Sequence, residues 1–391
     1  MAKKKAAKKK SPSAKKAGKK KKAPAKKVVG EKRSYCNLPS VAPRSFGPNI
    51  GVDRQRLILM SDQKWANGTK LRYYFFNKPT DGQSVVFQDG TTGFIPWVGS
   101  SAERQLVKDA FKVWKDVGIG LEFEEVANRE DAQIRIGFMK GDGHWSYVGR
   151  QILGQGVNAR TMNFGQNLPF IENGIDTAIH EIGHTLGFPH EHQNPNAGIV
   201  WNEQAVINDL AQPPNEWDEA TTRHNILNKI APDSVQGSSW DPDSIMHYPF
   251  KAGMIVSPPQ YSGGLEPAGG LSPRDIAWVK TFYPELRDAD VTDLRPFESS
   301  QLKLAPGEQA NFRIQPQETR YYDIQTFGES DTNAVLFEKD GDEFRYLTAD
   351  DSSGEDRGSS LRVKLFRDHS YMLRLRLYFA QQVGNVAVMM W

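Results

Sequence analysis

The 391-residue sequence has a single cysteine, Cys36, so no disulfide bond can form within the chain. The fold must therefore depend on a hydrophobic core or a bound metal, and cysteine usage gives no sign of an oxidising compartment. The sequence also lacks an uncharged apolar run of about 18 residues, so we expect no membrane-spanning helix. No apolar stretch of about 7–15 residues follows the first lysines, so we expect no secretory signal peptide either.

Acidic residues are almost absent from the first part of the chain. Residues 1–34 hold 16 Lys and Arg residues and one acid, a net charge of +15, whereas the remainder holds 34 bases and 46 acids, a net charge of −12. Residues 1–34 offer almost nothing to bury, so they are predicted to form a disordered Lys/Ala-rich tail. Such a tail is either a solvated arm or a non-specific contact for nucleic acid, an anionic surface or the acidic body.

Hydrophobic patterning divides the rest of the chain into three parts. Residues 35–65 read as an extended segment, and residues 66–287 mix strand-like and helix-like patterns. Residues 291–391 contain six short alternating runs separated by turn residues, which predicts a C-terminal β-sandwich. The expected fold class is therefore α+β, with a mixed domain followed by an all-β domain.

Within residues 66–287, apolar spacing predicts individual elements. Strands are expected at 71–76, 85–90, 121–126, 132–138 and 161–165. Helices are expected after a cap at Ser101, over 173–187 with Asn173 as N-cap, and after a cap at Ser272. Residues 193–270 read as mostly irregular.

The densest group of candidate metal ligands is HEIGHTLGFPHEH, at residues 180–192. On a helix, His180 and His184 project from one face, one turn apart, and two imidazoles at this spacing can bind one Zn²⁺. Gly187 permits a sharp turn, after which His190 can return as a third ligand and leave one position for water.

Glu181 is adjacent to the first of these histidines, where its carboxylate can reach a metal-bound water. The alternative is an amphipathic helix with capped or exposed histidines. That alternative explains neither Glu181 nor Gly187, so the sequence predicts a catalytic zinc site.

The full pattern HExxHxxGxxH, followed by SIMHY at 244–248, resembles the astacin family of the metzincin clan of zinc endopeptidases. Further matches are GHWSYVG at 143–149, TMNFG at 161–165, HEHQNP at 190–195 and the terminal LSPRDI…FYP. The resemblance implies a twisted mixed sheet, an active-site helix and a C-terminal helix for residues 66–287, and a pro-like role for 35–65. Because the chain has no disulfide, it is similar to the cysteine-poor microbial branch of the family.

The resemblance also implies roles for single residues. One Zn²⁺ would be bound by His180, His184 and His190. Glu181 would be the general base, taking a proton from the zinc-bound water and giving it to the leaving amine. Met246 would lie in a turn beneath the metal, and Tyr248 would be a mobile fifth ligand that stabilises the oxyanion. Taken alone, Met246 could fill the core and Tyr248 could be an ordinary buried tyrosine.

The segment TMNFG would supply the edge strand against which an extended peptide substrate pairs. The residues concerned are Thr161, Met162, Asn163 and Phe164.

Cys36 lies upstream of the predicted catalytic domain, in the proline-flanked sequence YCNLPS. A thiolate binds zinc well, so Cys36 could occupy the open zinc position and keep the enzyme latent, as the C-x-x-P type segment of some metzincin propeptides does. The alternative is a small buried hydrophobic residue, which is the usual place of a free cysteine.

The predicted function is zinc-dependent hydrolysis of internal bonds in a peptide or protein substrate, by a monomer. The alternative is a polyanion-binding protein that uses residues 1–34 and carries a catalytically silent metzincin-like domain. Glu181 argues against an inactive domain, because such a domain needs no base beside its metal. Location stays open, because the family suggests action outside the cell although no signal peptide is visible.

Overall fold

The computed structural model describes most of the chain after the basic tail. The described residues are 34–41, 64–65, 67–87, 89–230, 239–285, 291–341, 343–351, 353–354, 358–379 and 381–391. The predicted tail, apart from Ser34, and most of the predicted segment 35–65 lie outside these ranges.

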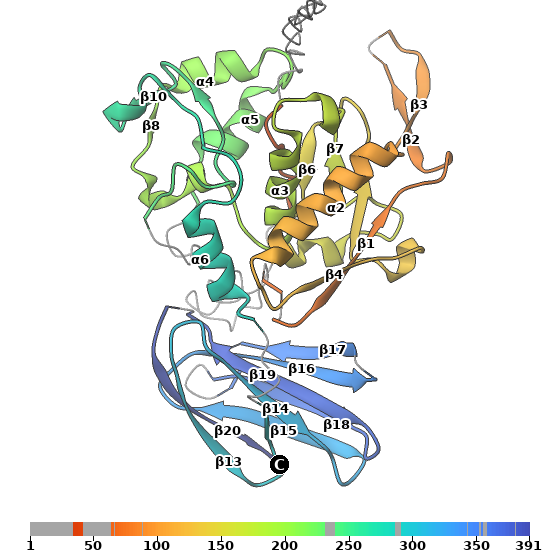
Figure 1. Cartoon of the computed structure of the whole chain (residues 1–391), viewed down its shortest axis with the longest axis vertical. Helices are drawn as coiled ribbons and strands as arrows, with labels where there is room; N and C mark the ends of the chain where they lie inside the picture. Colours follow the sequence, from red (N-terminus) through yellow and green to blue (C-terminus); the bar gives the residue numbers. More distant parts are fainter. Residues whose placement is uncertain are drawn as a thin grey trace, which may run out of the picture. The chain divides into compact units, whose positions relative to one another are not determined.

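A five-stranded mixed sheet, with strand order β4-β1-β5-β7-β6, forms the framework of the first half (Figure 1). Its strands are β1 (Lys70–Phe75), β4 (Glu122–Glu125), β5 (Ile134–Gly137), β6 (His144–Ser146) and β7 (Met162–Phe164). Four of them are parallel, and β6 pairs antiparallel with β7 at one edge. The strands predicted at 71–76, 121–126, 132–138 and 161–165 all lie in this sheet, whereas β6 was not predicted.

Two long helices, α2 (Ser101–Asp116) and α3 (Gly174–Thr185), pack against this sheet (Figure 1). The predicted apolar stripe of α2 is buried, with Val107, Phe111 and Trp114 in the same core as Ile134 of β5. The N-cap of α2 is Ser100, one residue before the predicted cap, and it forms a capping box with the third helical residue. The helix α6 (Pro273–Phe282) starts at its predicted cap, Ser272.

Asn173 stands at the N-cap position of α3, but it differs from the prediction in its geometry. Its φ is +53°, a left-handed conformation, and its side chain makes no capping hydrogen bond. A nearby carboxylate, Asp176, instead lies in the positively polarised first turn of the helix.

The region 193–270 contains more regular structure than its sequence indicated. The elements are β8 (Val200–Trp201), α4 (Glu203–Leu210), α5 (Glu219–Thr222), a π-helical turn (Arg223–Leu227), β9 (Phe250–Lys251), β10 (Ile255–Ser257) and β11 (Gly264–Leu265). These elements are short, and α4 buries only Val206 and Leu210. Two apolar positions are too few to give a recognisable helical period. A separate hairpin consists of β2 (Gly82–Val86) and β3 (Thr92–Pro96).

The regular elements described within residues 291–391 are all strands. They are β12 (Val291–Asp293), β13 (Ser299–Leu304), β14 (Gln309–Ile314), β15 (Arg320–Phe327), β16 (Thr332–Asp340), β17 (Glu343–Asp350), β18 (Ser360–Leu365), β19 (Ser370–Leu377) and β20 (Gly384–Met390). They form two sheets, β12-β14-β19-β16-β17 and β13-β20-β15-β18. One core takes Phe312 and Leu373 from the first sheet and Ile324 and Val388 from the second. All six predicted runs form strands here.

None of the helices in the described part of the chain is long and apolar enough to cross a membrane.

Candidate metal centre

The end of helix α3 determines how the chain returns to it. Gly187 has a φ of +94°, a left-handed conformation that side chains with a Cβ rarely adopt. Its amide donates to the carbonyl of His184 (2.8 Å), and the amide of Phe188 donates to the carbonyl of Gly183 (3.1 Å), the pairing of a Schellman motif. The predicted role of Gly187 as a helix stop is confirmed. The turn carries the following segment, with His190, back toward the helix.

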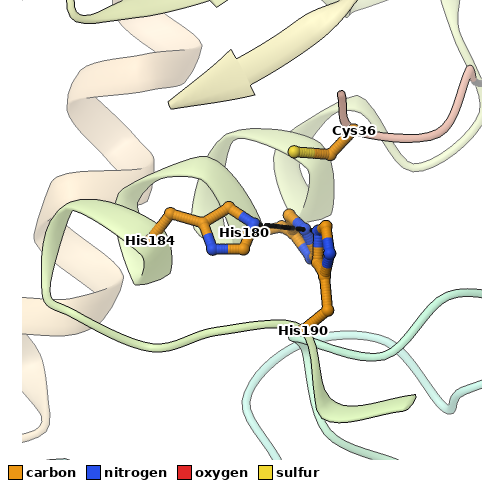
Figure 2. Close-up of side chains that lie close together, drawn as sticks. All are labelled: Cys36, His180, His184 and His190. Carbon is orange, nitrogen blue, oxygen red and sulfur yellow. Dashed lines mark hydrogen bonds between the residues drawn. The ribbon is translucent and has the colours of Figure 1, made fainter. Parts of the chain in front are cut away.

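Three imidazoles from the helix and this turn converge on one point (Figure 2). Nε2 of His184 lies 3.1 Å from Nε2 of His180 and 3.1 Å from Nε2 of His190. The thiol of Cys36 completes the group, in which all four ligand atoms lie within 4.8 Å of one another. All four side chains are buried. The structure therefore brings the predicted ligands and the predicted latch residue together.

Backbone carbonyls orient the two helical histidines so that their Nε2 atoms face this point. Nδ1 of His180 lies 2.7 Å from the carbonyl oxygen of Ile245, and Nδ1 of His184 lies 2.7 Å from that of Phe188. A carbonyl oxygen can only accept, so Nδ1 of each ring carries the hydrogen and Nε2 presents a lone pair. Lone pairs this close repel unless a cation lies between them. Imidazole nitrogens and a thiolate are zinc ligands, so these residues fit one Zn²⁺.

Burial keeps the imidazoles of His184 and His190 neutral, which is the form that binds a metal. It lowers the pKa of His184 to about 4. It also lowers the pKa of His190 well below its ordinary value, with a further contribution from the neighbouring histidines.

The predicted base and the predicted tyrosine both contact Cys36. Sγ of Cys36 lies 3.4 Å from Oε2 of Glu181, and burial together with this carboxylate raises the pKa of the thiol. The hydroxyl of Tyr248 donates to the backbone carbonyl of Cys36 (2.9 Å) and lies against Nε2 of His190. The cysteine thus lies among the groups that the sequence predicted to be catalytic.

Met246 lies directly against helix α3, as a turn beneath the metal would require. A Cβ added to Gly183 would come within 2.3 Å of Sδ of Met246. Glycine at this position therefore allows the close approach of Met246 to the helix.

The sequence did not single out the residue that holds this turn in place. Asp275, at the start of α6, accepts hydrogen bonds from Oγ of Ser244 (2.6 Å) and from the amides of Ile245 (2.8 Å) and Ser272 (2.9 Å). The carbonyl of Ile245 in turn orients His180. The only sequence signal for Asp275 was its favourable place in the first turn of a helix.

The prediction that TMNFG forms the edge strand is wrong. Strand β7 lies between β5 and β6, and the residues Thr161, Met162, Asn163 and Phe164 are all fully buried. The edge is formed by β6, which the chain reaches through the loop after β5. A short strand with apolar residues is compatible with either position, and only strand order separates the two.

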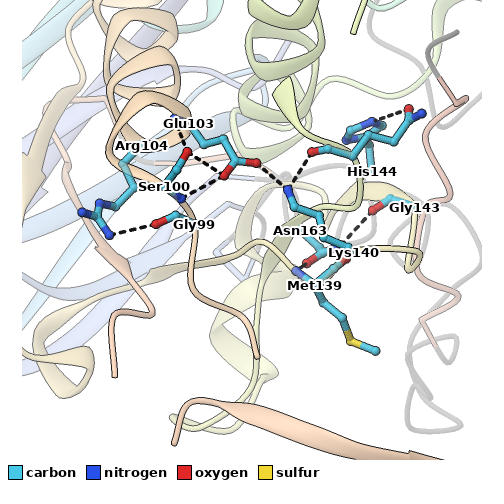
Figure 3. Close-up of polar contacts among 10 residues, drawn as sticks. Gly99, Ser100, Glu103, Arg104, Met139, Lys140, Gly143, His144 and Asn163 are labelled. Carbon is cyan, nitrogen blue, oxygen red and sulfur yellow. Dashed lines mark hydrogen bonds and ion pairs between the residues drawn. The ribbon is translucent and has the colours of Figure 1, made fainter. Parts of the chain in front are cut away.

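Asn163 has a different role, which is to hold the loop that leads into the edge strand (Figure 3). Its side chain accepts from the amide of Met139 (2.9 Å) and donates to the carbonyls of Met139 (3.1 Å) and Gly143 (2.8 Å). Nζ of Lys140 ties the same loop to the carboxylate of Glu103 and to the carbonyl of Gln166. The N-terminal cap of α2 and the edge strand thereby belong to one polar network.

An extended segment, residues 34–41, lies along this edge strand. Cys36 forms a parallel bridge with His144, and the amide of Asn37 donates to the carbonyl of His144 (2.8 Å). Three further backbone amides of the segment donate to the oxygen atoms of side-chain amides, and sequence reasoning missed all three. The three contacts are Gln166 to the amide of Ser34 (2.8 Å), Asn215 to the amide of Tyr35 (2.8 Å) and Asn225 to the amide of Leu38 (2.9 Å). These contacts join residues more than 130 positions apart, so local sequence carries no signal for them.

Comparison with known proteins identifies the segment that carries this centre. Residues 94–256 match the family model Astacin, which describes a family of peptidases. Tolloid-like protein 1 of Mus musculus is 31% identical over 206 residues, which are 49% of this chain and 18% of that protein. Bone morphogenetic protein 1 of Xenopus laevis is 29% identical over 207 residues, which are 49% of this chain and 26% of that protein.

Among solved structures, that of myroilysin is 28% identical and covers 58% of this chain and 98% of its own, with a TM-score of 0.47. This chain spans about a fifth to a quarter of the length of the two curated relatives. The segment that matches the family model includes the histidine motif. Residues 94–256, which contain the three converging histidines, are therefore similar to the astacin family of peptidases.

Proposed function

We propose that the chain is a zinc-dependent endopeptidase that hydrolyses internal peptide bonds, and that Cys36 holds it in a latent form. One observation carries the proposal. Three imidazole nitrogens and the carboxylate of Glu181 surround a buried point at which an extended peptide segment already lies.

In this proposal the metal is held by His180, His184 and His190. When bound, zinc would supply Lewis-acid polarisation of water and of the scissile carbonyl. Glu181 takes the proton of the attacking water on its carboxylate and gives it to the leaving amine. The hydroxyl of Tyr248 already donates to a peptide carbonyl, that of Cys36, so it is placed to donate to the oxyanion of a substrate.

The latch explains why the segment 34–41 blocks this reaction. Sγ of Cys36 takes a ligand position beside the three histidines and also lies against the base, Glu181. While the cysteine is there, neither the metal position nor the base is open to water and substrate. The segment itself pairs with β6, where an extended substrate would also pair by strand addition.

Because the unaltered chain is proposed to be latent, the peptidase is tested by adding Glu181→Gln to the full-length Cys36→Ser protein. This change removes the base but keeps the shape, so we expect casein hydrolysis to be lost while zinc content stays near one ion per chain. Glu122→Gln in the same Cys36→Ser protein, on the surface strand β4, is a matched control that should hydrolyse casein like its Cys36→Ser parent. Hydrolysis that persists in Glu181→Gln, or that survives removal of zinc by a chelator, would contradict the proposal.

The latch is tested by Cys36→Ser, which replaces the thiol by a hydroxyl that binds zinc poorly. We expect higher casein hydrolysis than in the wild type. Ser40→Ala, an exposed change four residues along the same segment, should leave hydrolysis as it was. Unchanged hydrolysis in Cys36→Ser would remove the latch but not the peptidase.

The remaining assignments are separate proposals. Residues 66–287 would be the catalytic domain of a monomer, and residues 291–391 an accessory domain. The family suggests action outside the cell. Contact of residues 1–34 with a polyanion would coexist with proteolysis; deleting the tail and measuring DNA retention at two salt concentrations tests it.

A further inference from the structure

We propose that an aromatic pocket beside the metal centre selects an aromatic side chain next to the scissile bond of the substrate. The aromatic pocket consists of Trp217, Tyr248, Pro249 and Phe250, and at present it holds Tyr35. This inference rests on the proposed peptidase function and names a substrate class for it.

The ring of Tyr35 meets an aromatic ring on several sides. Its centroid lies 4.8 Å from that of Tyr248 in an edge-to-face arrangement, 6.0 Å from that of Phe250 and 6.3 Å from that of Trp217. Its hydroxyl donates to the carbonyl of Pro249. The pocket thus offers both a ring-shaped apolar surface and an acceptor for a phenol, which suits Tyr best and Phe next.

A substrate would reach this pocket because the segment is held mainly through its backbone. The amides of Ser34, Tyr35, Asn37 and Leu38 donate to oxygen atoms of Gln166, Asn215, His144 and Asn225 respectively. Any extended peptide carries such amides, so a substrate that replaces the segment can use the same acceptors.

The position of Cys36 relates the pocket to the reacting bond. Sγ of Cys36 lies among the three histidines, where a scissile carbonyl must also come. The neighbouring residue of the segment, Tyr35, fills the aromatic pocket. A substrate residue adjacent to the scissile bond would therefore place its side chain there.

A competing preference for a basic side chain follows from the surroundings. A cavity of about 330 Å³ adjoins Tyr35, and four carboxylates are in its lining: Glu172, Asp176, Asp209 and Glu266. One of them, Asp209, is already paired with Lys251. We favour the aromatic class because the rings contact a side chain of that class directly, and the test separates the two.

The test uses the full-length protein with Tyr35→Ala and Cys36→Ser together, which vacates the pocket. Cleavage of a peptide library should show Tyr and Phe enriched at one position flanking the scissile bond. Adding Trp217→Ala should reduce this enrichment, whereas adding Tyr321→Ala, an exposed tyrosine of β15, should not. Enrichment of Lys and Arg at that position, or no enrichment of any residue, would overturn the inference.

A binding measurement keeps the test independent of catalysis. A fluorescent peptide with the sequence of residues 34–39 is bound to the same double variant and displaced by unlabelled peptides. The version with Tyr35→Ala should compete about 10- to 100-fold less well, and Tyr35→Phe less than about tenfold less well. Equal competition by all three overturns the inference. Absence of hydrolysis together with a preference for the aromatic peptides would instead count against the peptidase alone.

Discussion

Replacing Asp275 by alanine should weaken the zinc site although this residue contacts no zinc ligand. Its carboxylate accepts three hydrogen bonds of 2.6–2.9 Å, two of them from the turn that contains Met246. A hydrogen bond to a charged acceptor contributes about 1.5–3 kcal/mol. Burial offsets part of this stabilisation, because it disfavours the charged carboxylate and so raises the pKa of Asp275. We therefore expect a net loss of about 2–4 kcal/mol in the free energy of unfolding, measured by urea denaturation.

The consequence for the metal follows from the carbonyl of Ile245, which orients the ring of His180. Removing a group that orients a metal ligand costs about 10- to 100-fold in metal affinity, so we expect a loss of that size in Asp275→Ala. Zinc affinity is measured by competition with a chromogenic chelator. Asp293→Ala, which breaks an exposed ion pair with Arg313, is the control and should change affinity less than about twofold. Lower stability with zinc affinity within about twofold of the wild type would refute the reasoning.

Three further outcomes can be measured. Gly187→Ala places a Cβ at a φ of +94°, so it should lower the free energy of unfolding by about 1–2 kcal/mol. It should also lower zinc affinity, because it disturbs the turn that returns His190 to the helix. An unchanged free energy of unfolding together with unchanged zinc affinity would contradict this. Burial lowers the pKa of His247 from 6.5 to about 4, so the folded state resists a proton that the unfolded chain accepts below pH 6.5. His247 alone should therefore lower the free energy of unfolding by about 3 kcal/mol as pH drops from 6.5 to 4, and the fall should be smaller by about that amount in His247→Gln. Equal pH profiles of the two proteins in urea denaturation would argue against it. Asn163→Ala removes three hydrogen bonds from the loop before β6 and should raise KM for casein in the Cys36→Ser protein more than it lowers kcat; an effect confined to kcat would count against an edge-strand role.

The metal centre was predictable wherever its geometry is local. Spacing of four residues on a helix places His180 and His184 on one face, and the left-handed turn at Gly187 returns the chain to that face. The apolar stripe of α2 and the alternating runs after residue 290 were equally readable, since each reflects a period within a single element. The amino-acid sequence by itself therefore determined the histidine group, its resemblance to the astacin family and most of the regular elements.

Tertiary structure alone decided which groups surround that centre. Strand order decides whether β6 or β7 forms the edge of the sheet, and neither short sequence predicts that order. The placement of Cys36 beside Glu181 joins residues 145 positions apart, and the contact of Asn225 with the segment spans 187. Such contacts depend on how segments that are distant in sequence pack together, and no periodic pattern along the chain predicts them. For that reason the sequence located the histidine group, whereas packing determined what lies beside the histidines and what holds the turn that contains Met246.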